Sequence, residues 1–188
     1  MRPLEKLSAK DHLTDPDLLQ LSSTGDEEAF VILYQRHQGP VFRFALHMSG
    51  RRETAEEVTQ DVFLALLAGL RRYARDRGPL QSYLIGMARH YVRRYLASSP
   101  LVAELPSRNH EQLFDHINTE QELSTLRSAI LKLPPNYREV VVLCDLEGLE
   151  YAQAAEHLGC AVGTVRSRLH RARAFLEARL RKRERCPV

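Results

Sequence analysis

Apolar positions along the chain recur with the period of an α-helix, and no alternating strand pattern persists. The pattern in the N-terminal half predicts helices over residues 16–22, 27–37, 41–48 and 54–70, with another starting at Pro79. Gly25-Asp26 and Gly39-Pro40 are the expected breaks, because glycine and proline interrupt helices. Thr14 with Pro16 and Asp17 predicts the first start, and Thr54 with Glu57 forms a capping-box pattern. We therefore expect an all-α fold.

Two of these helices have clear faces. Between 54 and 70, an apolar residue recurs every fourth position and predicts a buried stripe: Val58, Val62, Leu66 and Leu70. In the helix after Pro79, one face is apolar (Leu80, Leu84, Met87, Tyr91, Tyr95) and the opposite side is basic (Arg89, His90, Arg93, Arg94).

The C-terminal part predicts helices over 119–131, 136–145, 151–158 and 162–183. The last two, joined by a tight turn at 159–161, have helix-turn-helix spacing. Ala154 and Ala155 allow close helix crossing, and Gly159 allows a left-handed helix end. On the last helix the anchoring face is expected to be Val162, Val165, Leu169, Ala172, Leu176 and Leu180. Proline-containing, acidic residues 98–118 lack periodicity, so we expect two small helical domains, 14–97 and 119–183, joined by a flexible linker.

Composition limits the classes of protein to which the chain can belong. The 188 residues have a formal net charge of +3, ordinary for a globular protein. Cys144, Cys160 and Cys186 are scattered without a CxxC pair, which argues against a disulfide framework or a zinc site. No apolar run is long enough for a signal peptide or a membrane span, so we expect a cytoplasmic protein.

Charge is concentrated at the C-terminus, where residues 162–185 hold nine lysines and arginines and two glutamates. Arg166, Ser167, His170 and Arg171 are expected on the outer side of the last helix, where arginine suits guanine edges and phosphates. A solvated helix end favoured by the helix dipole is an alternative interpretation for the basic residues from Arg179 onward.

The segment LPPNYREVVVLCDLEGLEYAQAAEHLGCAVGTVRSRLHRAR (Leu133–Arg173) resembles the fourth conserved region of extracytoplasmic-function sigma factors, which are specificity subunits of bacterial RNA polymerase. The resemblance implies a domain that reads the minus-thirty-five promoter element and docks on the flap of the polymerase beta subunit. It assigns DNA contacts to Thr164, Arg166, Ser167, His170, Arg171 and Arg173. Glu150 and Ala161 stand where the family usually has a hydroxyl-bearing helix cap.

The N-terminal half resembles the second conserved region through GDEEAFVILYQRHQGPVFRFAL (Gly25–Leu46) and ETAEEVTQDVFLALLAGL (Glu53–Leu70). The resemblance implies docking on the clamp of the beta-prime subunit through Glu56, Glu57, Gln60, Asp61 and Leu64. An ordinary acidic helix start is the alternative for Glu56 and Glu57. The resemblance also implies contacts with the opened minus-ten strand through Tyr73, Arg75, Arg77, Arg89, His90, Arg93 and Arg94. Tyr73 could equally be a core residue.

In this half the chain departs from the family at four positions. Leu67 and Tyr83 stand near usual tryptophans, His90 stands at a usual asparagine and Arg94 near a usual acid. These departures leave the sequence preference at the minus-ten element open.

Other classes of protein fit the sequence less well. No phosphate-binding loop, nucleophile motif or ExxH pair appears, so we expect no catalytic residue, cofactor, metal or small-molecule substrate. A stand-alone helix-turn-helix regulator would need a sensor or dimerisation domain in place of the docking-helix pattern, and a polymerase adaptor without DNA contact would not need the arginine face. The expected partners are core RNA polymerase, promoter DNA and, as in many family members, an anti-sigma factor.

Overall fold

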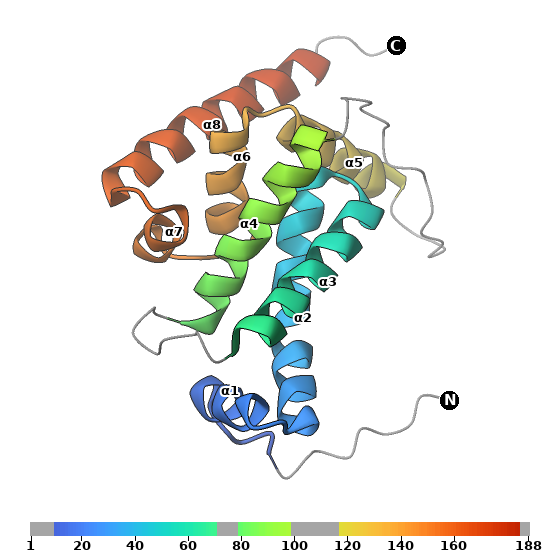
Figure 1. Cartoon of the computed structure of the whole chain (residues 1–188). Helices are drawn as coiled ribbons and strands as arrows, with labels where there is room; N and C mark the ends of the chain where they lie inside the picture. Colours follow the sequence, from blue (N-terminus) through green and yellow to red (C-terminus); the bar gives the residue numbers. More distant parts are fainter. Residues whose placement is uncertain (1–9, 71–78, 99–116, 185–188) are drawn as a thin grey trace.

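The computed structural model describes residues 10–70, 79–98 and 117–184, and within these residues it contains helices and no strand, so the all-α prediction is confirmed. Figure 1 shows α4 (Leu80–Ser98) in the middle of the molecule. Helices α2 (Glu27–Ser49) and α3 (Arg52–Gly69) pack on one side of α4, and the last three C-terminal helices lie on the other. Tyr73, Arg75, Arg77 and most of the predicted linker lie outside the described residues.

The N-terminal helices start where polar side chains satisfy free backbone N–H groups. Helix α1 (Asp15–Ser23) follows Thr14, as the sequence predicted, and the Asp17 carboxylate accepts hydrogen bonds from the Thr14 backbone N–H at 3.3 Å and from the Thr14 hydroxyl at 2.5 Å. Helix α2 follows Asp26, which accepts a hydrogen bond from the Ala29 N–H at 3.0 Å. Both are side-chain caps of the kind that stabilise a first helical turn.

The predicted break at Gly39-Pro40 is wrong, because α2 runs through it as one helix of 23 residues. Proline inside a helix costs about 3 kcal/mol. Here the buried face continues without a change of phase across Pro40, through Leu33, Val41 and Phe44, all 0% exposed. Burial of this face offsets the cost of the proline, which is a tertiary effect that a local pattern does not contain.

Two predictions about the next helices need correction. Helix α3 begins at Arg52 after an uncapped Arg51, so Thr54 is a buried residue inside the helix rather than its cap. The predicted stripe of α3 is buried as expected. On α4 the buried face is Leu80, Leu84, Ile85, Ala88 and Val92. Met87, Tyr91 and Tyr95 of the predicted face only pack against its edge.

The C-terminal part consists of α5 (Ile117–Leu131), α6 (Pro135–Val141), the π-helical turn η3 (Val142–Leu146), α7 (Tyr151–Leu158) and α8 (Val162–Glu184). Gly159 ends α7 with φ +62°, and Ala154 and Ala155 are buried, as predicted for the helix-turn-helix. Val165, Leu169 and Ala172 anchor α8, whereas Val162 is 39% exposed and does not belong to the predicted face.

The buried residues form one continuous apolar cluster that extends from Leu18 to Ala172 and includes both halves of the chain. At Gly50, the left-handed end of α2 (φ +72°), an added Cβ would lie 2.6 Å from the Leu131 side chain of α5. Two features therefore favour glycine at this position: the left-handed backbone conformation and the close approach of the C-terminal part.

Arg138 of α6 also joins the two halves. Its guanidinium donates to the backbone carbonyls of Met48 (2.5 Å), Leu133 (3.1 Å) and Leu131. Burial lowers the pKa of Arg138 below its usual value, but an arginine stays protonated in proteins. One cation thus satisfies carbonyl groups at the ends of α2 and α5.

We expect Arg138→Met to lower the free energy of unfolding by about 2 kcal/mol, because the change fills a similar volume and leaves buried carbonyl groups without a donor. Urea unfolding followed by circular dichroism measures this loss. Arg179→Met, on an exposed part of α8, is the matched control and should change stability little. Equal midpoints for the two variants would contradict the role of Arg138.

Candidate nucleic-acid and polymerase interfaces

The outer face of α8 is basic and exposed. Arg166, Ser167, His170 and Arg171 all lie on the solvent side of the helix, opposite the buried anchors Val165, Leu169 and Ala172. Among the described residues, no carboxylate pairs with Arg166, His170 or Arg171. The Arg166 guanidinium lies 6.0 Å from the centre of the Tyr151 ring of α7. This face can approach the edges of bases or phosphates without first breaking an ion pair.

The remaining two predicted residues of α8 are less available. Thr164 is half-buried and its backbone carbonyl accepts a hydrogen bond from the Ser167 hydroxyl at 3.1 Å. Arg173 forms a two-point ion pair with Asp145 of η3, at 2.5 and 3.2 Å, and this contact raises the pKa of Arg173. Arg173 therefore fixes α8 to η3 in this structure.

The basic side of α4 is occupied by carboxylates. Arg89 binds Glu139 of α6 with Nε at 2.9 Å and Nη2 at 3.1 Å, and Arg93 binds the same carboxylate at 2.9 Å. Arg94 pairs with Asp61 of α3 at 3.0 Å and lies 4.8 Å from the centre of the Tyr91 ring. His90 is exposed beside Tyr91. The structure thus brings the predicted minus-ten residues of α4 together but ties the three arginines to acids.

An apolar groove of about 630 Å³ runs between α2 and α3. Three of the predicted docking residues, Glu56, Gln60 and Leu64, line it, together with Tyr34, Phe63 and Leu67. Leu64 and Leu67 are 55% and 48% exposed. Glu57 is exposed on the same helix, whereas Asp61 turns toward α4 and accepts from Arg94 and Tyr95. Exposed apolar residues bordered by acids are typical of a protein-binding surface.

Several acidic and basic residues that matter here were not singled out from the sequence. Glu139 is 0% exposed, and Glu147 forms a bidentate pair with Arg43 of α2 (2.8 and 3.1 Å) that raises the pKa of Arg43. The only sequence signal was a charged residue beside the apolar run Val140–Leu143. A buried charge needs a partner, but the pattern does not say which residue supplies it.

Neither a metal centre nor a membrane span emerges from the part of the chain that the structure describes. No three His, Cys, Asp or Glu side chains gather there as metal ligands. None of the described helices is both long and apolar enough to cross a bilayer.

Comparison with known families agrees with this architecture. Residues 33–99 match the family described as Sigma-70 region 2, and residues 123–176 match the one described as Sigma-70, region 4. The fold and the exposed α8 face define a helical protein of two parts with a DNA-binding helix-turn-helix. The chain belongs to the sigma-70 family of RNA polymerase sigma factors, in its extracytoplasmic-function group. Sigma factors are regulatory subunits of the polymerase rather than catalysts.

Relatives and solved structures give the extent of the likeness. The chain is 33% identical over 176 residues to the ECF RNA polymerase sigma factor SigE of Mycolicibacterium smegmatis, covering 85% of this chain and 66% of that protein. It is 32% identical over 163 residues to SigC of Mycobacterium tuberculosis, covering 84% and 86%. The structure of CnrH in complex with the cytosolic domain of CnrY superimposes with a TM-score of 0.69 at 28% identity, covering 89% and 97%.

Proposed function

We propose that the chain acts as an alternative sigma factor that binds core RNA polymerase and directs it to a particular set of promoters. The observation that carries the proposal is the exposed Arg166–Arg171 face of a helix-turn-helix in a chain of this family. In this proposal α8 reads the upstream promoter element through Arg166, Ser167, His170 and Arg171. Thr164 is half-buried and Arg173 is ion-paired with Asp145, so both have supporting roles at the edge of the contact.

Helix α4 and the segment before it hold the opened minus-ten strand. The residues proposed for this contact are Arg89, His90, Arg93 and Arg94, with Tyr73, Arg75 and Arg77. Basic side chains with neighbouring aromatic rings suit single-stranded DNA, because phosphates meet cations while bases stack. Tyr91 and Tyr95, which lie beside Arg94 on α4, supply such rings.

The groove between α2 and α3 is the proposed contact with the beta-prime clamp, and the C-terminal part also contacts the beta flap. The polymerase performs the nucleotide chemistry, so the chain has no reaction of its own, and its place of action is the cytoplasm, where the polymerase works. A partner of the anti-sigma type is part of the proposal: the sigma factor RpoE of Bartonella quintana was solved with the anti-sigma factor NepR, and CnrH was solved with the cytosolic domain of CnrY.

The decisive experiment adds the purified chain to core RNA polymerase and transcribes genomic promoter fragments. Promoter-specific transcripts that depend on the chain are the expected result. Binding of palindromic DNA by the chain alone, with no core binding and no transcripts, would favour a stand-alone regulator instead.

We expect Leu64→Asp to weaken core binding by about tenfold, because it places a charge on an exposed apolar side chain that lines the groove. Surface plasmon resonance with immobilised core polymerase measures the affinity. Leu123→Asp on α5, where Leu123 is 46% exposed, is the matched control and should bind as the unchanged chain does. If the two variants bind equally well, the groove is not the docking surface.

A further inference from the structure

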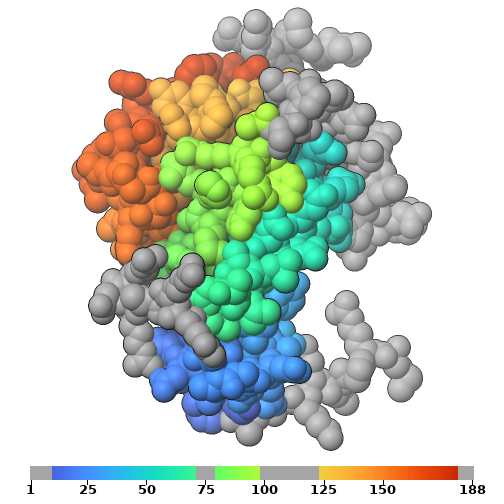
Figure 2. Space-filling model, viewed as in Figure 1, coloured from blue at the N-terminus to red at the C-terminus, as the bar shows by residue number. Residues whose placement is uncertain are grey.

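A pocket of about 530 Å³ lies between α6 and α8, and we call it the α6–α8 pocket. Its polar and basic lining comes from both helices: Asn136 and Tyr137 of α6, and Thr164, Ser167, Arg168 and Arg171 of α8. None of the described residues that line it is acidic. In the space-filling view of Figure 2, the C-terminal helices, coloured orange to red, form one outer flank of the molecule. The α6–α8 pocket therefore carries a net positive charge.

Arg168 and Arg171 lie close together on α8. They are three positions apart, and Thr164 is four positions before Arg168, so all three share one face of the helix. Arg168 is half-buried and Arg171 is exposed. Among the described residues, no carboxylate pairs with either of them. Two like charges at this spacing repel each other, and an anion bound between them would relieve the repulsion.

The polar groups of the pocket suit a phosphate group in particular. A guanidinium presents its N–H groups in a planar fork that matches two phosphate oxygens. A phosphate has further oxygens, so it can also accept hydrogen bonds from the Asn136 amide and the Tyr137 hydroxyl of α6. Two helices thus offer donors to one tetrahedral anion.

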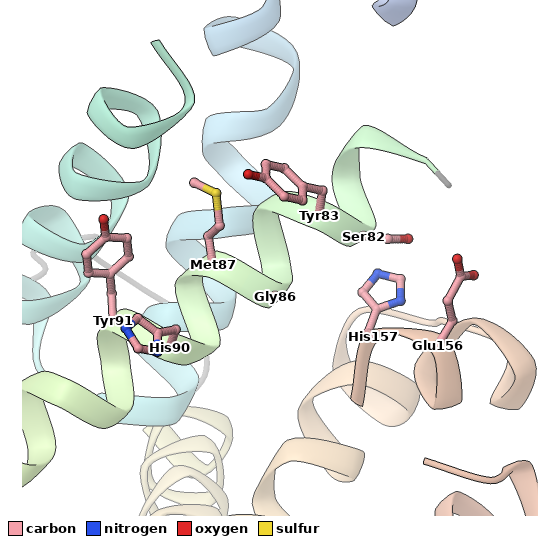
Figure 3. Close-up of a pocket in the computed structure, with 8 residues that line it drawn as sticks. All are labelled: Ser82, Tyr83, Gly86, Met87, His90, Tyr91, Glu156 and His157. Atoms are coloured by element: carbon pink, nitrogen blue, oxygen red, sulfur yellow. The ribbon is translucent and has the colours of Figure 1, made fainter. Parts of the chain in front are cut away.

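A second pocket shows the contrast. The pocket of about 410 Å³ between α4 and α7 is lined by Ser82 and His90 on α4 and by Glu156 and His157 on α7. Figure 3 shows Glu156 and His157 opposite Ser82. The Glu156 carboxylate repels a phosphate at that position. Of these two pockets, the α6–α8 pocket is the one whose charge favours an anion.

The α6–α8 pocket adjoins the proposed reading face of α8. Ser167 and Arg171 belong to both. A recognition helix lies in the major groove of DNA, which is about 12 Å wide and bordered by a phosphate backbone on each side. When the Arg166–Arg171 face enters the groove, a phosphate of one strand comes within reach of Arg168 and of the first turn of α6. Such backbone contacts fix the register of a recognition helix without reading the sequence.

We propose that the α6–α8 pocket binds a phosphate group, held by Arg168 and Arg171 with Asn136 and Tyr137, and that in promoter DNA this is a backbone phosphate beside the bases that α8 reads. The inference rests on the proposed function, because it extends the DNA contact of α8 onto α6. Arg168 is then a contact that contributes affinity at any sequence, whereas Arg166 contributes the choice of sequence. A free phosphate compound has the same chemistry and is the other possible source of the group.

The test compares the full chain with its Arg168→Met variant, which keeps a side chain of similar length and removes the charge. Fluorescence anisotropy measures binding to a short labelled duplex of mixed sequence at several concentrations of KCl. We expect about tenfold weaker binding at low salt. We also expect the slope of log affinity against log salt to become shallower by about 1, the change for one lost phosphate contact. Arg179→Met removes an equal charge from an exposed position of α8 and should leave the slope unchanged.

Folding of each variant is checked by circular dichroism. If Arg168→Met does not fold, Arg168→Lys keeps the test, because lysine retains the charge and loses the two-point geometry. It should bind the duplex about threefold more weakly with an unchanged slope.

Inorganic phosphate, compared with chloride at equal ionic strength, is the second probe. Phosphate should displace the duplex from the unchanged chain and lose this advantage over chloride on Arg168→Met. If phosphate binding depends on Arg168 and duplex binding does not, the pocket serves a free phosphate compound and the assignment to DNA is overturned. If Arg168→Met changes neither, the phosphate site itself is rejected.

Transcription by the unchanged chain with core polymerase separates the two proposals. Promoter-specific transcripts together with an unaltered salt slope for Arg168→Met reject only the phosphate site. Absence of transcripts together with a shallower slope rejects the proposed function and retains the phosphate site.

Discussion

The double variant Arg166→Ala with Arg171→Ala is expected to lose transcription that depends on the upstream element while it still binds core polymerase. Each arginine that contacts a guanine edge or a phosphate contributes about 1–3 kcal/mol to DNA binding. Removal of both should therefore weaken the contact by at least roughly tenfold. The fold should persist, because both side chains are exposed and neither pairs with a described acid.

Run-off transcription from a promoter found with the unchanged chain measures the effect, and co-elution with core polymerase measures docking. Arg179→Ala is the matched control, an exposed arginine farther along α8. If the double variant initiates as well as the control, the recognition face of α8 has been assigned wrongly.

A second large effect is expected in the core. Phe44 of α2 is 0% exposed within the continuous apolar cluster. We expect Phe44→Ala to lower the free energy of unfolding by about 3–5 kcal/mol, since it removes buried surface and leaves a cavity. This is a substantial part of the stability of a typical small protein.

Chemical denaturation monitored by circular dichroism measures the loss. Phe175→Ala supplies the comparison, because Phe175 of α8 is 51% exposed and its loss should cost far less. Similar losses for the two phenylalanines would contradict the assignment of Phe44 to the centre of the core.

Elements with strong local signals were predictable. The bounds 151–158 of α7 were correct because Gly159 ends the helix in a conformation that favours glycine. The exposed Arg166–Arg171 face followed from the phase of Val165, Leu169 and Ala172. In both cases residues close in sequence determine the outcome.

Elements decided by distant contacts were not predictable. Pro40 was expected to break α2, but the buried face on either side of it keeps one helix. The pairing of Glu139 could not be predicted from the sequence, because its partners Arg89 and Arg93 lie about fifty residues earlier in the chain. Pairing across such a separation depends on how α4 and α6 meet, and a pattern with a period of 3.6 residues carries no information about that.

The ion pairs Arg43–Glu147 and Arg93–Glu139, which join the two halves of the chain, are sensitive to dissolved salt. Arg43 and Arg93 are about half exposed, so mobile ions reach one side of these pairs and screen them, which favours separation of the two halves. The same ions compete with the protein for the counterion layer of DNA and weaken every phosphate contact. A rise in ionic strength is therefore expected to loosen the contact between the two halves of the chain and, at the same time, to weaken its binding to DNA.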